Sequence, residues 1–258
     1  MVRGLYTAYT GMVNQQKRLD TITNNLANAS TTGYKREGAT ARAFDEYMGV
    51  RVNDKTVGYK VTRIGEMSLG VKIGENYTDY SQGSLRNTEN TYDLAIEGNG
   101  FFNISFTNKL GDQSIKYTRD GNFTMDAEGA LRTTDGDYVQ GESGDIYLPT
   151  DATQIAIVAT GEIYADGEYI DTIKITDFED YNYLKKYGEN MYDTVDGAVE
   201  KDTNAILHQG YLESSNINVI TEMVEMITIT RAYESNQKAL QTADEMTDKA
   251  VNQVGRLS

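Results

Sequence analysis

Residues with the chemistry to catalyse reactions or bind transition metals are sparse in this sequence. The 258 residues include one histidine, His208, and no cysteine. A transition-metal site needs several imidazole or thiolate ligands, and His208 has no second histidine and no cysteine to complete such a set. We therefore interpret His208 as a surface residue and expect neither a metal ion nor a cofactor.

Three short motifs rich in Asp, Asn and Gly are similar to ligand-binding loops but are explained by turns. Asp120-Gly121-Asn122 and Asp135-Gly136-Asp137 are similar to the start of a calcium loop. Neither motif continues into a loop of about twelve residues that ends in a bidentate glutamate. Gly98-Asn99-Gly100 lacks the third glycine and the following helix of a dinucleotide-binding loop. We predict that all three motifs form turns between strands.

Tyrosines and acidic residues leave one enzymatic alternative, the hydrolysis of sugars. Aromatic rings stack on sugars, and a pair of carboxylates catalyses most glycoside hydrolysis. The candidate side chains are Tyr181, Tyr183, Tyr187, Tyr192, Glu179 and Asp180. Because the chain has 39 acidic residues, a pair at the spacing of a glycosidase is expected by chance. We therefore predict no catalytic residues and place these tyrosines on an exposed β surface at a subunit contact.

Charge and hydropathy exclude several classes of partner. With 24 Lys and Arg against 39 Asp and Glu, the formal net charge is −15, which opposes general affinity for nucleic acid or an anionic membrane. No run approaches the roughly eighteen apolar residues of a membrane-spanning helix. The first residues also lack the apolar core and the cleavage motif of a signal peptide. We expect no nucleic-acid partner, no membrane span and no cleaved signal peptide.

The C-terminal region, residues 216–257, has the pattern of a long amphipathic helix. Its apolar residues recur at alternating steps of three and four, which places them in one narrow stripe. Ser214, Ser215 and Asn216 are the predicted N-terminal cap, and Glu222 and Glu225 lie near the positive end of the helix dipole. The stripe consists of Val219, Glu222, Met226, Ile229, Tyr233, Asn236, Leu240, Ala243, Thr247, Ala250, Val254 and Leu257.

The N-terminal region repeats the same spacing. Its stripe consists of Leu5, Ala8, Met12, Gln15, Leu19, Ile22 and Leu26. We expect this helix to end near Asn28, because turn-forming residues and Gly33 follow. A stripe this narrow suits packing against another helix. The two terminal helices are therefore predicted to pair in a coiled-coil-like arrangement.

The middle of the chain has the pattern of an antiparallel β domain. Runs of alternating or β-branched residues are separated by dipeptides such as Glu128-Gly129 and Asp166-Gly167, which favour hairpin turns. The predicted strands are 92–96, 102–106, 115–118, 123–125, 155–158, 163–165 and 170–175. The predicted fold class is α+β, with a mostly antiparallel β central domain between the two helices.

The same patterns divide the chain into four segments. Residues 1–33 form the N-terminal helix of a terminal helical domain, and residues 210–258 form its C-terminal helix. Residues 34–76 lose periodicity and contain scattered glycines, so we interpret them as a connecting segment with room for a hairpin. Residues 77–209 form the central β-rich domain.

Several stretches resemble the signatures of bacterial flagellar axial proteins, the rod and hook family. They occur in family order and at family spacing, and they frame nearly the whole chain. Within the family, the length and the paired ends are most similar to a distal rod type, with the proximal type close behind. The stretches are Asn24–Lys35 (NNLANASTTGYK), Asp93–Phe102 (DLAIEGNGFF), Tyr117–Phe123 (YTRDGNF), Gly210–Asn218 (GYLESSNIN), Glu222–Ile227 (EMVEMI) and Arg231–Glu234 (RAYE).

The resemblance implies a structural subunit of the flagellar basal-body rod. Such a subunit is exported through the flagellar export apparatus, polymerises helically with copies of itself, contacts other rod and hook proteins, and transmits torque from motor to hook. It would lie in the basal body, outside the cytoplasmic membrane. The implied assembly interface consists of Leu5, Met12, Leu19, Ile22, Leu26, Asn24, Asn25, Asn28, Met226, Ile229, Tyr233, Leu240 and Val254.

Simpler alternatives exist for each of these interpretations. The terminal stripes could form an ordinary helix pair within a monomer, and Asn24, Asn25 and Asn28 could be polar residues at a helix end. A cell-wall glycosidase, or an assembly cap or chaperone associated with an appendage, remains the alternative function. Presence at high copy number in purified appendages would exclude the cap, and loss of wall-digesting activity on replacing one carboxylate would support the glycosidase.

Overall fold

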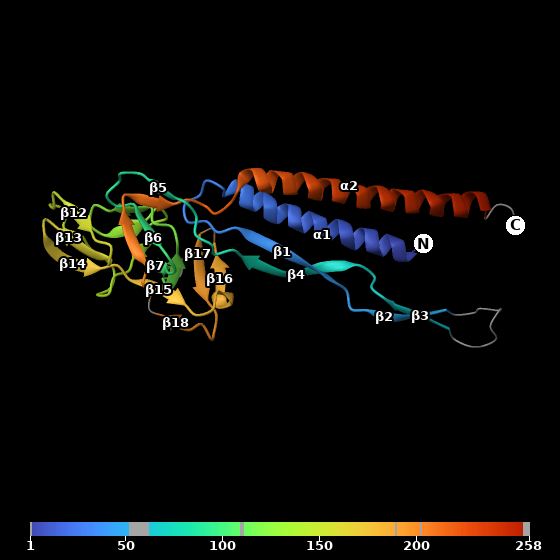
Figure 1. The fold of residues 1–258 in the computed structure, drawn as a ribbon, viewed down its shortest axis with the longest axis horizontal. Coiled ribbons are helices and arrows are strands. Elements are labelled where there is room, and N and C mark those ends of the chain that lie inside the picture. The colour runs from blue at the N-terminus through green and yellow to red at the C-terminus, as the bar shows by residue number, and fades with distance from the viewer. Residues whose placement is uncertain (1, 52–61, 109–110, 189, 202, 255–258) are drawn as a thin grey trace. The chain divides into compact units, whose positions relative to one another are not determined.

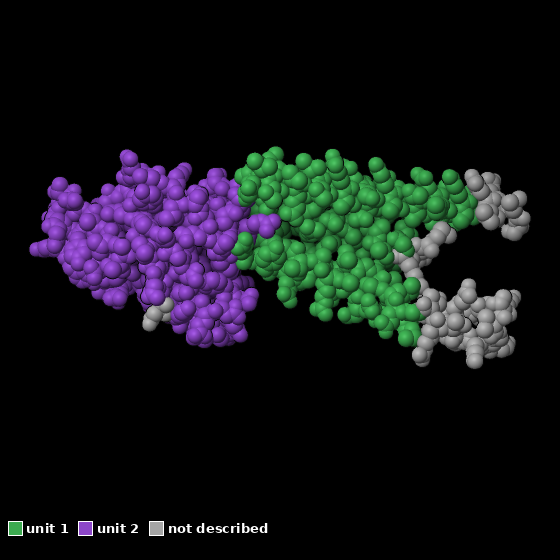
Figure 2. Space-filling view, in the orientation of Figure 1, with its two compact units in different colours: residues 1–27, 37–79, 218–258 green, residues 28–36, 80–217 purple. Residues whose placement is uncertain are grey.

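The computed structural model describes residues 2–51, 62–108, 111–188, 190–201 and 203–254. The chain is an α+β protein with two compact units, each assembled from segments that are distant in sequence (Figures 1 and 2). Unit 1 contains residues 1–27, 37–79 and 218–258, and unit 2 contains residues 28–36 and 80–217. The predicted α+β class is confirmed.

Unit 1 contains both long helices, α1 (Val2–Ala27) and α2 (Val219–Lys249), and α2 continues into a π-helical turn (Ala250–Val254). The predicted cap of α2 was wrong. Asn218 is the cap, because its side-chain oxygen accepts from the backbone N–H groups of Ile220 and Thr221 at 3.1 and 3.2 Å. Such a bond satisfies donors that the first helical turn leaves free. Neither helix, over the residues described, is long and apolar enough to cross a membrane.

The strands of unit 1 form two antiparallel ribbons between the helices in sequence. They are β1 (Glu37–Ala43) paired with β4 (Val71–Thr78), and β2 (Tyr47–Arg51) paired with β3 (Thr62–Met67). Helix α1 contacts α2 as well as β1 and β4, so it lies between the second helix and the ribbon (Figure 1). Helix α1 therefore packs one face against α2 and other faces against β1 and β4.

Unit 2 is built almost wholly of antiparallel strands. Its described residues contain a nine-stranded sheet in the order β16-β17-β8-β7-β11-β10-β9, with β15 also beside β7 and β18 beside β15. Smaller sheets are β12-β13-β14, β19-β6 and β20-β5. The bounds are β5 (Leu85–Asn87), β6 (Leu94–Glu97), β7 (Phe101–Thr107), β8 (Gln113–Thr118), β9 (Phe123–Met125), β10 (Leu131–Thr133), β11 (Tyr138–Val139), β12 (Ile155–Ile157), β13 (Glu162–Ala165), β14 (Glu168–Thr172), β15 (Ile175–Phe178), β16 (Leu184–Tyr187), β17 (Met191–Thr194), β18 (Glu200–Lys201), β19 (Ile206–Gln209) and β20 (Tyr211–Glu213), with a short 3-10 helix at Tyr181–Tyr183.

Strand β7 separates the two apolar clusters of unit 2. Side chains alternate between the two faces of a strand, and accordingly Phe102 and Ile104 enter the larger cluster while Phe101 enters the smaller one. The larger cluster also contains Leu94, Ile96, Phe123, Leu131, Val139, Ile146, Leu148, Ile157, Ile163, Ile173 and Leu207. The smaller one contains Tyr117, Phe178, Leu184 and Tyr192. Both faces of β7 are therefore buried, and this burial includes the polar residues Asn103 and Ser105.

The predicted strands and turns are found with one correction. Each predicted run overlaps a strand, but residues 170–175 contain the end of β14 and the first residue of β15. The break falls where the chain leaves the β13–β14 hairpin to pair with β7. At the tip of that hairpin Asp166 and Gly167 both have positive φ, 50° and 90°, as a two-residue turn of type I′ requires.

Candidate functional site

The two terminal helices pack against each other inside unit 1, and each contributes one buried apolar residue of its predicted stripe. Ile22 and Ile229 are 4% and 3% exposed, and Arg18 of α1 donates to Glu225 of α2 at 3.0 Å. Because later residues of α1 meet earlier residues of α2, the two helices run antiparallel. The other predicted positions are half-buried, namely Leu5, Met12, Leu19, Leu26, Met226, Tyr233 and Leu240.

The ends of the α2 stripe are not covered by α1. Val219 is 41% exposed, and every residue from 244 to 252 is exposed. Helix α2 extends beyond the first residues of α1 (Figure 1), since it has 31 residues against 26. The side chain of Val254 and the whole of Leu257 lie outside the described residues.

The three asparagines that end α1 have different environments. Asn25 is fully buried, and its side chain donates to the carbonyl of Glu37 at 2.8 Å and accepts from the N–H of Glu37 at 3.0 Å. It also donates to the carboxylate of Glu222 at 3.3 Å. Asn24 is exposed. Asn28 accepts from Thr31 through its side chain and its carbonyl, at 3.2 Å each, so it closes the turn after α1. Asn25 thus joins α1 to β1 and α2 within one copy.

A second apolar stripe lies on α2, away from the buried positions. Ile220, Met223, Val224 and Ile227 are 75%, 50%, 59% and 52% exposed. Positions separated by three, four and seven residues share one helix face. The sequence prediction missed this stripe because it followed a single line of apolar residues, although the signal is present in the sequence. Helix α2 therefore has one apolar face against α1 and another that is exposed in the single chain.

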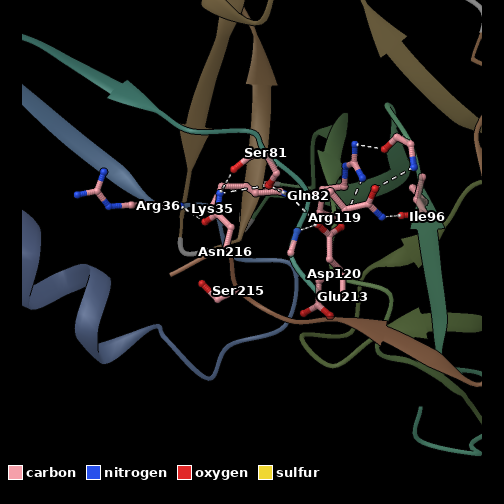
Figure 3. A network of polar contacts seen from close by, with 12 residues as sticks. Lys35, Arg36, Ser81, Gln82, Ile96, Arg119, Asp120, Glu213, Ser215 and Asn216 are labelled. Atoms are coloured by element: carbon pink, nitrogen blue, oxygen red, sulfur yellow. Dashed lines mark hydrogen bonds and ion pairs between the residues drawn. The ribbon is translucent and has the colours of Figure 1, made fainter. Parts of the chain in front are cut away.

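Unit 2 contains a buried ionic cluster, which we call the polar junction, centred on Glu213 (Figure 3). One carboxylate oxygen of Glu213 accepts from Lys35 Nζ at 2.6 Å and from the N–H of Gly83 at 2.8 Å. Its other oxygen accepts from Arg119 Nη1 at 3.4 Å. The side chains of Lys35, Arg119 and Glu213 are 1%, 3% and 1% exposed. A carboxylate between two buried cations is stabilised by both of them.

Backbone contacts complete the polar junction. Asn216 accepts from the N–H of Arg36 at 2.8 Å and donates to Ser81, and the N–H of Gly33 donates to the carbonyl of Glu213 at 2.8 Å. Gly33 has φ of 66°, and a Cβ there would lie 2.5 Å from the backbone of Arg119. Only glycine fits this position without strain. The segment that follows α1 is thus held directly against the segment that precedes α2.

The sequence prediction did not select Lys35, Arg119 or Glu213. Each lies in a different stretch of the family resemblance, Asn24–Lys35, Tyr117–Phe123 and Gly210–Asn218. The signal that could have found them is charge, because each of these apolar or turn-rich stretches includes a charged residue. Opposite charges from three separate stretches are what a buried ionic cluster requires.

Asp120 forms a second, half-buried polar site in unit 2. Its carboxylate accepts from Thr32 Oγ1 at 2.7 Å, from the N–H of Asn122 at 3.0 Å and from Asn190 Nδ2 at 3.1 Å. Burial raises the pKa of Asp120, and these hydrogen bonds oppose the rise only in part. The predicted turn at Asp120-Gly121-Asn122 is therefore present, and its carboxylate joins the turn to the segment that follows α1.

A pH dependence follows for Asp120. A raised pKa means that the folded chain holds this proton more tightly than the unfolded chain, so the contribution of Asp120 to stability is greatest below its ordinary pKa of about 3.9. That contribution decreases as the pH rises through the raised value. We expect the stability lost in Asp120→Asn to be larger at acid pH than at neutral pH, measured by urea denaturation of both proteins over a pH series. A difference that grows toward neutral pH would contradict this assignment.

The predicted tyrosine surface was wrong for two of its four members. Tyr192 is 1% exposed and belongs to the smaller apolar cluster of unit 2, and Tyr181 packs against Tyr80 at a ring-centroid distance of 4.9 Å. Tyr183 and Tyr187 are 42% and 40% exposed, as predicted. Strand alternation explains only the difference between Tyr187 and Tyr192, because Tyr192 pairs with Lys186, the neighbour of Tyr187, and neighbouring residues of a strand face opposite sides. Tyr181 and Tyr183 belong to the short 3-10 helix.

The remaining candidate residues lie on the surface of unit 2. Glu179 and Asp180 are exposed, and Asp180 accepts from the N–H of Asn182 at 2.9 Å as the cap of the short 3-10 helix. His208 is paired with the exposed carboxylate of Glu97. Among the described residues, no group of three His, Asp or Glu side chains is placed to hold a metal ion.

Comparison with known proteins covers all three parts of the resemblance. Residues 5–35 match the family described as "Flagella basal body rod protein", residues 95–165 match "Flagellar hook protein FlgE/F/G D1 domain", and residues 208–254 match "Flagellar basal body rod FlgEFG protein C-terminal". These matches include Lys35, Arg119 and Glu213.

Relatives are similar over almost their whole length. The chain is 34% identical to the flagellar basal-body rod protein FlgG of Bacillus subtilis, over 98% of this chain and 99% of the relative. It is 34% identical to FlgG of Buchnera aphidicola from Acyrthosiphon pisum, over 96% and 98%, and 31% identical to FlgF of Caulobacter vibrioides, over the full length of both. At this identity and coverage, the chain belongs to the flagellar basal-body rod protein family.

Proposed function

We propose that this protein is a structural subunit of the flagellar basal-body rod, which polymerises helically through its terminal helices and transmits torque from motor to hook. Its partners are copies of itself, other rod and hook proteins, and the flagellar export apparatus that delivers it. Family membership supports this role, and the relatives named above are rod proteins. The role needs rigid contacts and no catalytic residue.

The observation that carries the proposal is the exposed stripe of Ile220, Met223, Val224 and Ile227 on α2. An apolar stripe on the outer face of a helix that already has a partner indicates a further partner. In a rod, that partner is a terminal helix of a neighbouring copy. The coiled-coil-like geometry of α1 and α2 belongs to the same proposal, because narrow stripes on both helices allow each pair to pack beside equivalent pairs.

The test of this function is a strain that lacks the protein. We expect its basal bodies, imaged after isolation, to have a missing or truncated rod and no hook, and the cells to be non-motile. The length of the remaining stub distinguishes a proximal from a distal position. Intact rods and hooks on swimming cells would contradict the proposal.

Leu240 provides a test of the terminal helices themselves. The residue is half-buried on the α2 stripe, and Leu240→Asp would bury a carboxylate without a cation when helices pack around it, which costs about 3 kcal/mol or more. We expect the variant to be blocked in polymerisation and motility while unit 2 stays folded, measured by swimming assays and by the tyrosine signal of purified protein. Thr242→Asp, at a neighbouring exposed position, is the control that should retain motility. Normal swimming of Leu240→Asp would remove this helix from the interface.

A further inference from the structure

Unit 1 contains a shallow groove between α1 and the β1/β4 ribbon. Its volume is about 170 Å³, which corresponds to the space of roughly six liquid waters, so it can accept one or two side chains. Its lining residues are largely apolar on both sides, with two lysines at positions 17 and 72. They are Tyr9, Thr10, Val13, Asn14, Lys17, Phe44, Val71, Lys72 and Ile73.

The groove contains a buried acceptor without a hydrogen bond. Asn14 is 5% exposed, and its side-chain oxygen has no donor among the described residues. A buried carbonyl oxygen without a donor destabilises the chain that contains it. An unsatisfied acceptor in an apolar groove therefore points to a donor supplied by something that binds there.

The charges of the groove select an acidic partner. Lys17 and Lys72 are both exposed, and the ammonium group of Lys72 lies 6.0 Å from the centre of the Phe44 ring. The groove is thus bordered by cations in a chain whose net charge is −15. Acidic side chains beside an apolar anchor would be attracted to it.

The end of α2 has the complementary features. Residues 244–252 are exposed, and among them Met246 and Val251 are 58% and 65% exposed. The same turns include three acidic residues, Asp244, Glu245 and Asp248, against one basic residue, Lys249. This end of the helix therefore combines apolar anchors with acids, whereas the groove combines an apolar lining with lysines.

The end of α2 cannot enter the groove of its own chain. Asn236 of α2 lies opposite Gly11 of α1, because a Cβ added to Gly11 would lie 3.0 Å from the side-chain nitrogen of Asn236. Met246 is ten residues farther along a straight helix, a rise of roughly 15 Å, and it lies in the direction that leads away from Val13. A contact between Met246 and the groove therefore requires a second copy of the chain.

We propose that, in the rod, residues 244–252 of α2 of one copy dock into the groove between α1 and the β1/β4 ribbon of a neighbouring copy. The inference rests on the proposed function and specifies one of its subunit contacts. The two surfaces are different, so the contact is heterologous and leaves a free groove at one end and a free helix at the other. A contact of this kind repeats without closing, as a filament requires.

Disulfide crosslinking tests the contact directly, because the chain has no native cysteine. The double variant Val13→Cys with Met246→Cys is expressed as the full chain in place of the native protein, and isolated rods are oxidised. We expect a ladder of disulfide-linked multimers on a non-reducing gel. Each single variant should give no ladder. Thr23→Cys with Met246→Cys, whose first position is exposed on α1 away from the groove lining, should also give none.

The outcomes separate this contact from the proposed function. Rods that assemble from Val13→Cys with Met246→Cys but give no ladder would overturn the contact and leave the rod function intact. Crosslinks to a different rod protein would overturn the choice of a second copy. Intact rods in the strain that lacks the protein would overturn the function itself.

Charge reversal tests the contact if the cysteine variant does not assemble. Lys17→Glu with Lys72→Glu should weaken polymerisation about tenfold or more, because two attractions become repulsions. Adding Asp244→Lys with Asp248→Lys should restore it. Failure of this rescue in protein that folds normally would overturn the proposal.

Asn14→Leu supplies a readout that a purely structural role would not give. The variant removes the unsatisfied acceptor, so the melting temperature of the monomer should not fall. Polymerisation should nevertheless weaken, because the donor of the docked helix loses its acceptor. A variant that polymerises as well as the native chain would show that Asn14 accepts nothing from a neighbour.

Discussion

Glu213→Gln is expected to reduce the stability of unit 2 by about 3–5 kcal/mol, since it removes the buried negative charge that Lys35 and Arg119 share. The substitution keeps the size of the side chain, so the loss reports charge and not packing. Lys35 Nζ lies 2.6 Å from the carboxylate and Arg119 Nη1 lies 3.4 Å from it. Urea denaturation followed by tyrosine fluorescence measures the change, because the chain has 19 tyrosines and no tryptophan.

Two controls make this result specific. Glu97→Gln makes the same chemical change at an exposed carboxylate that pairs with His208, and it should cost no more than about 1 kcal/mol. Adding Lys35→Met to Glu213→Gln removes one of the two cations that contact this carboxylate. The double variant should therefore lose less stability than the sum of the two single variants. A loss at Glu213 as small as that at Glu97 would show that the polar junction does not stabilise unit 2.

Asn25→Leu is expected to destabilise unit 1 by about 2–4 kcal/mol, because it removes the two hydrogen bonds that this buried side chain makes to the backbone of Glu37. The side chain of Asn25 satisfies both groups, at 3.0 and 2.8 Å. Its loss also takes one donor from the buried carboxylate of Glu222. We expect the helical circular dichroism signal to melt at lower temperature, and motility to decrease with it.

Asn24→Leu is the matched control for this change. Asn24 is the preceding residue of the same helix and is exposed, so Leu there should leave stability unchanged or raise it by a few tenths of a kcal/mol through its higher helix propensity, which is about 0.5 kcal/mol or less. The same gain applies at residue 25, and comparison of the two variants cancels it. Equal effects of the two substitutions would mean that Asn25 does not connect α1 to β1.

The helices and most strands could be predicted from the sequence because their determinants are local. The step of three and four places Ile22 and Ile229 on helix stripes, and the Asp166-Gly167 dipeptide specifies its hairpin. The helix that begins at Asn218 shows the limit of this reasoning. Ser214, Ser215 and Asn216 have the side chains of a cap, but Asn216 bonds to Arg36 and Ser81, which are distant in sequence.

The polar junction could not be predicted from local pattern. Lys35, Arg119 and Glu213 are separated by many residues, and each alone has the properties of a surface charge. Their burial depends on which strands pair, since β20 pairs with β5 and Arg119 directly follows β8. All three residues lie in stretches that carry the family resemblance, but the resemblance does not show which side chains are in contact. The exposed stripe on α2 was missed for a different reason, because one apolar stripe had already explained the helix.

The segments of unit 1 are distant in sequence, so they become available at different times when the chain is delivered from one end. Its α1 and ribbons come from the first 79 residues, whereas α2 comes from residues 218–258. A chain delivered from its N-terminus therefore possesses all of unit 2 before it possesses α2, and contacts of such long sequence separation form late. Both surfaces that α2 supplies, the exposed stripe and the acidic end, are present only after delivery is complete. Under the proposed function, incomplete subunits would thus be unable to join a growing rod, and completion of the chain would act as a checkpoint for assembly.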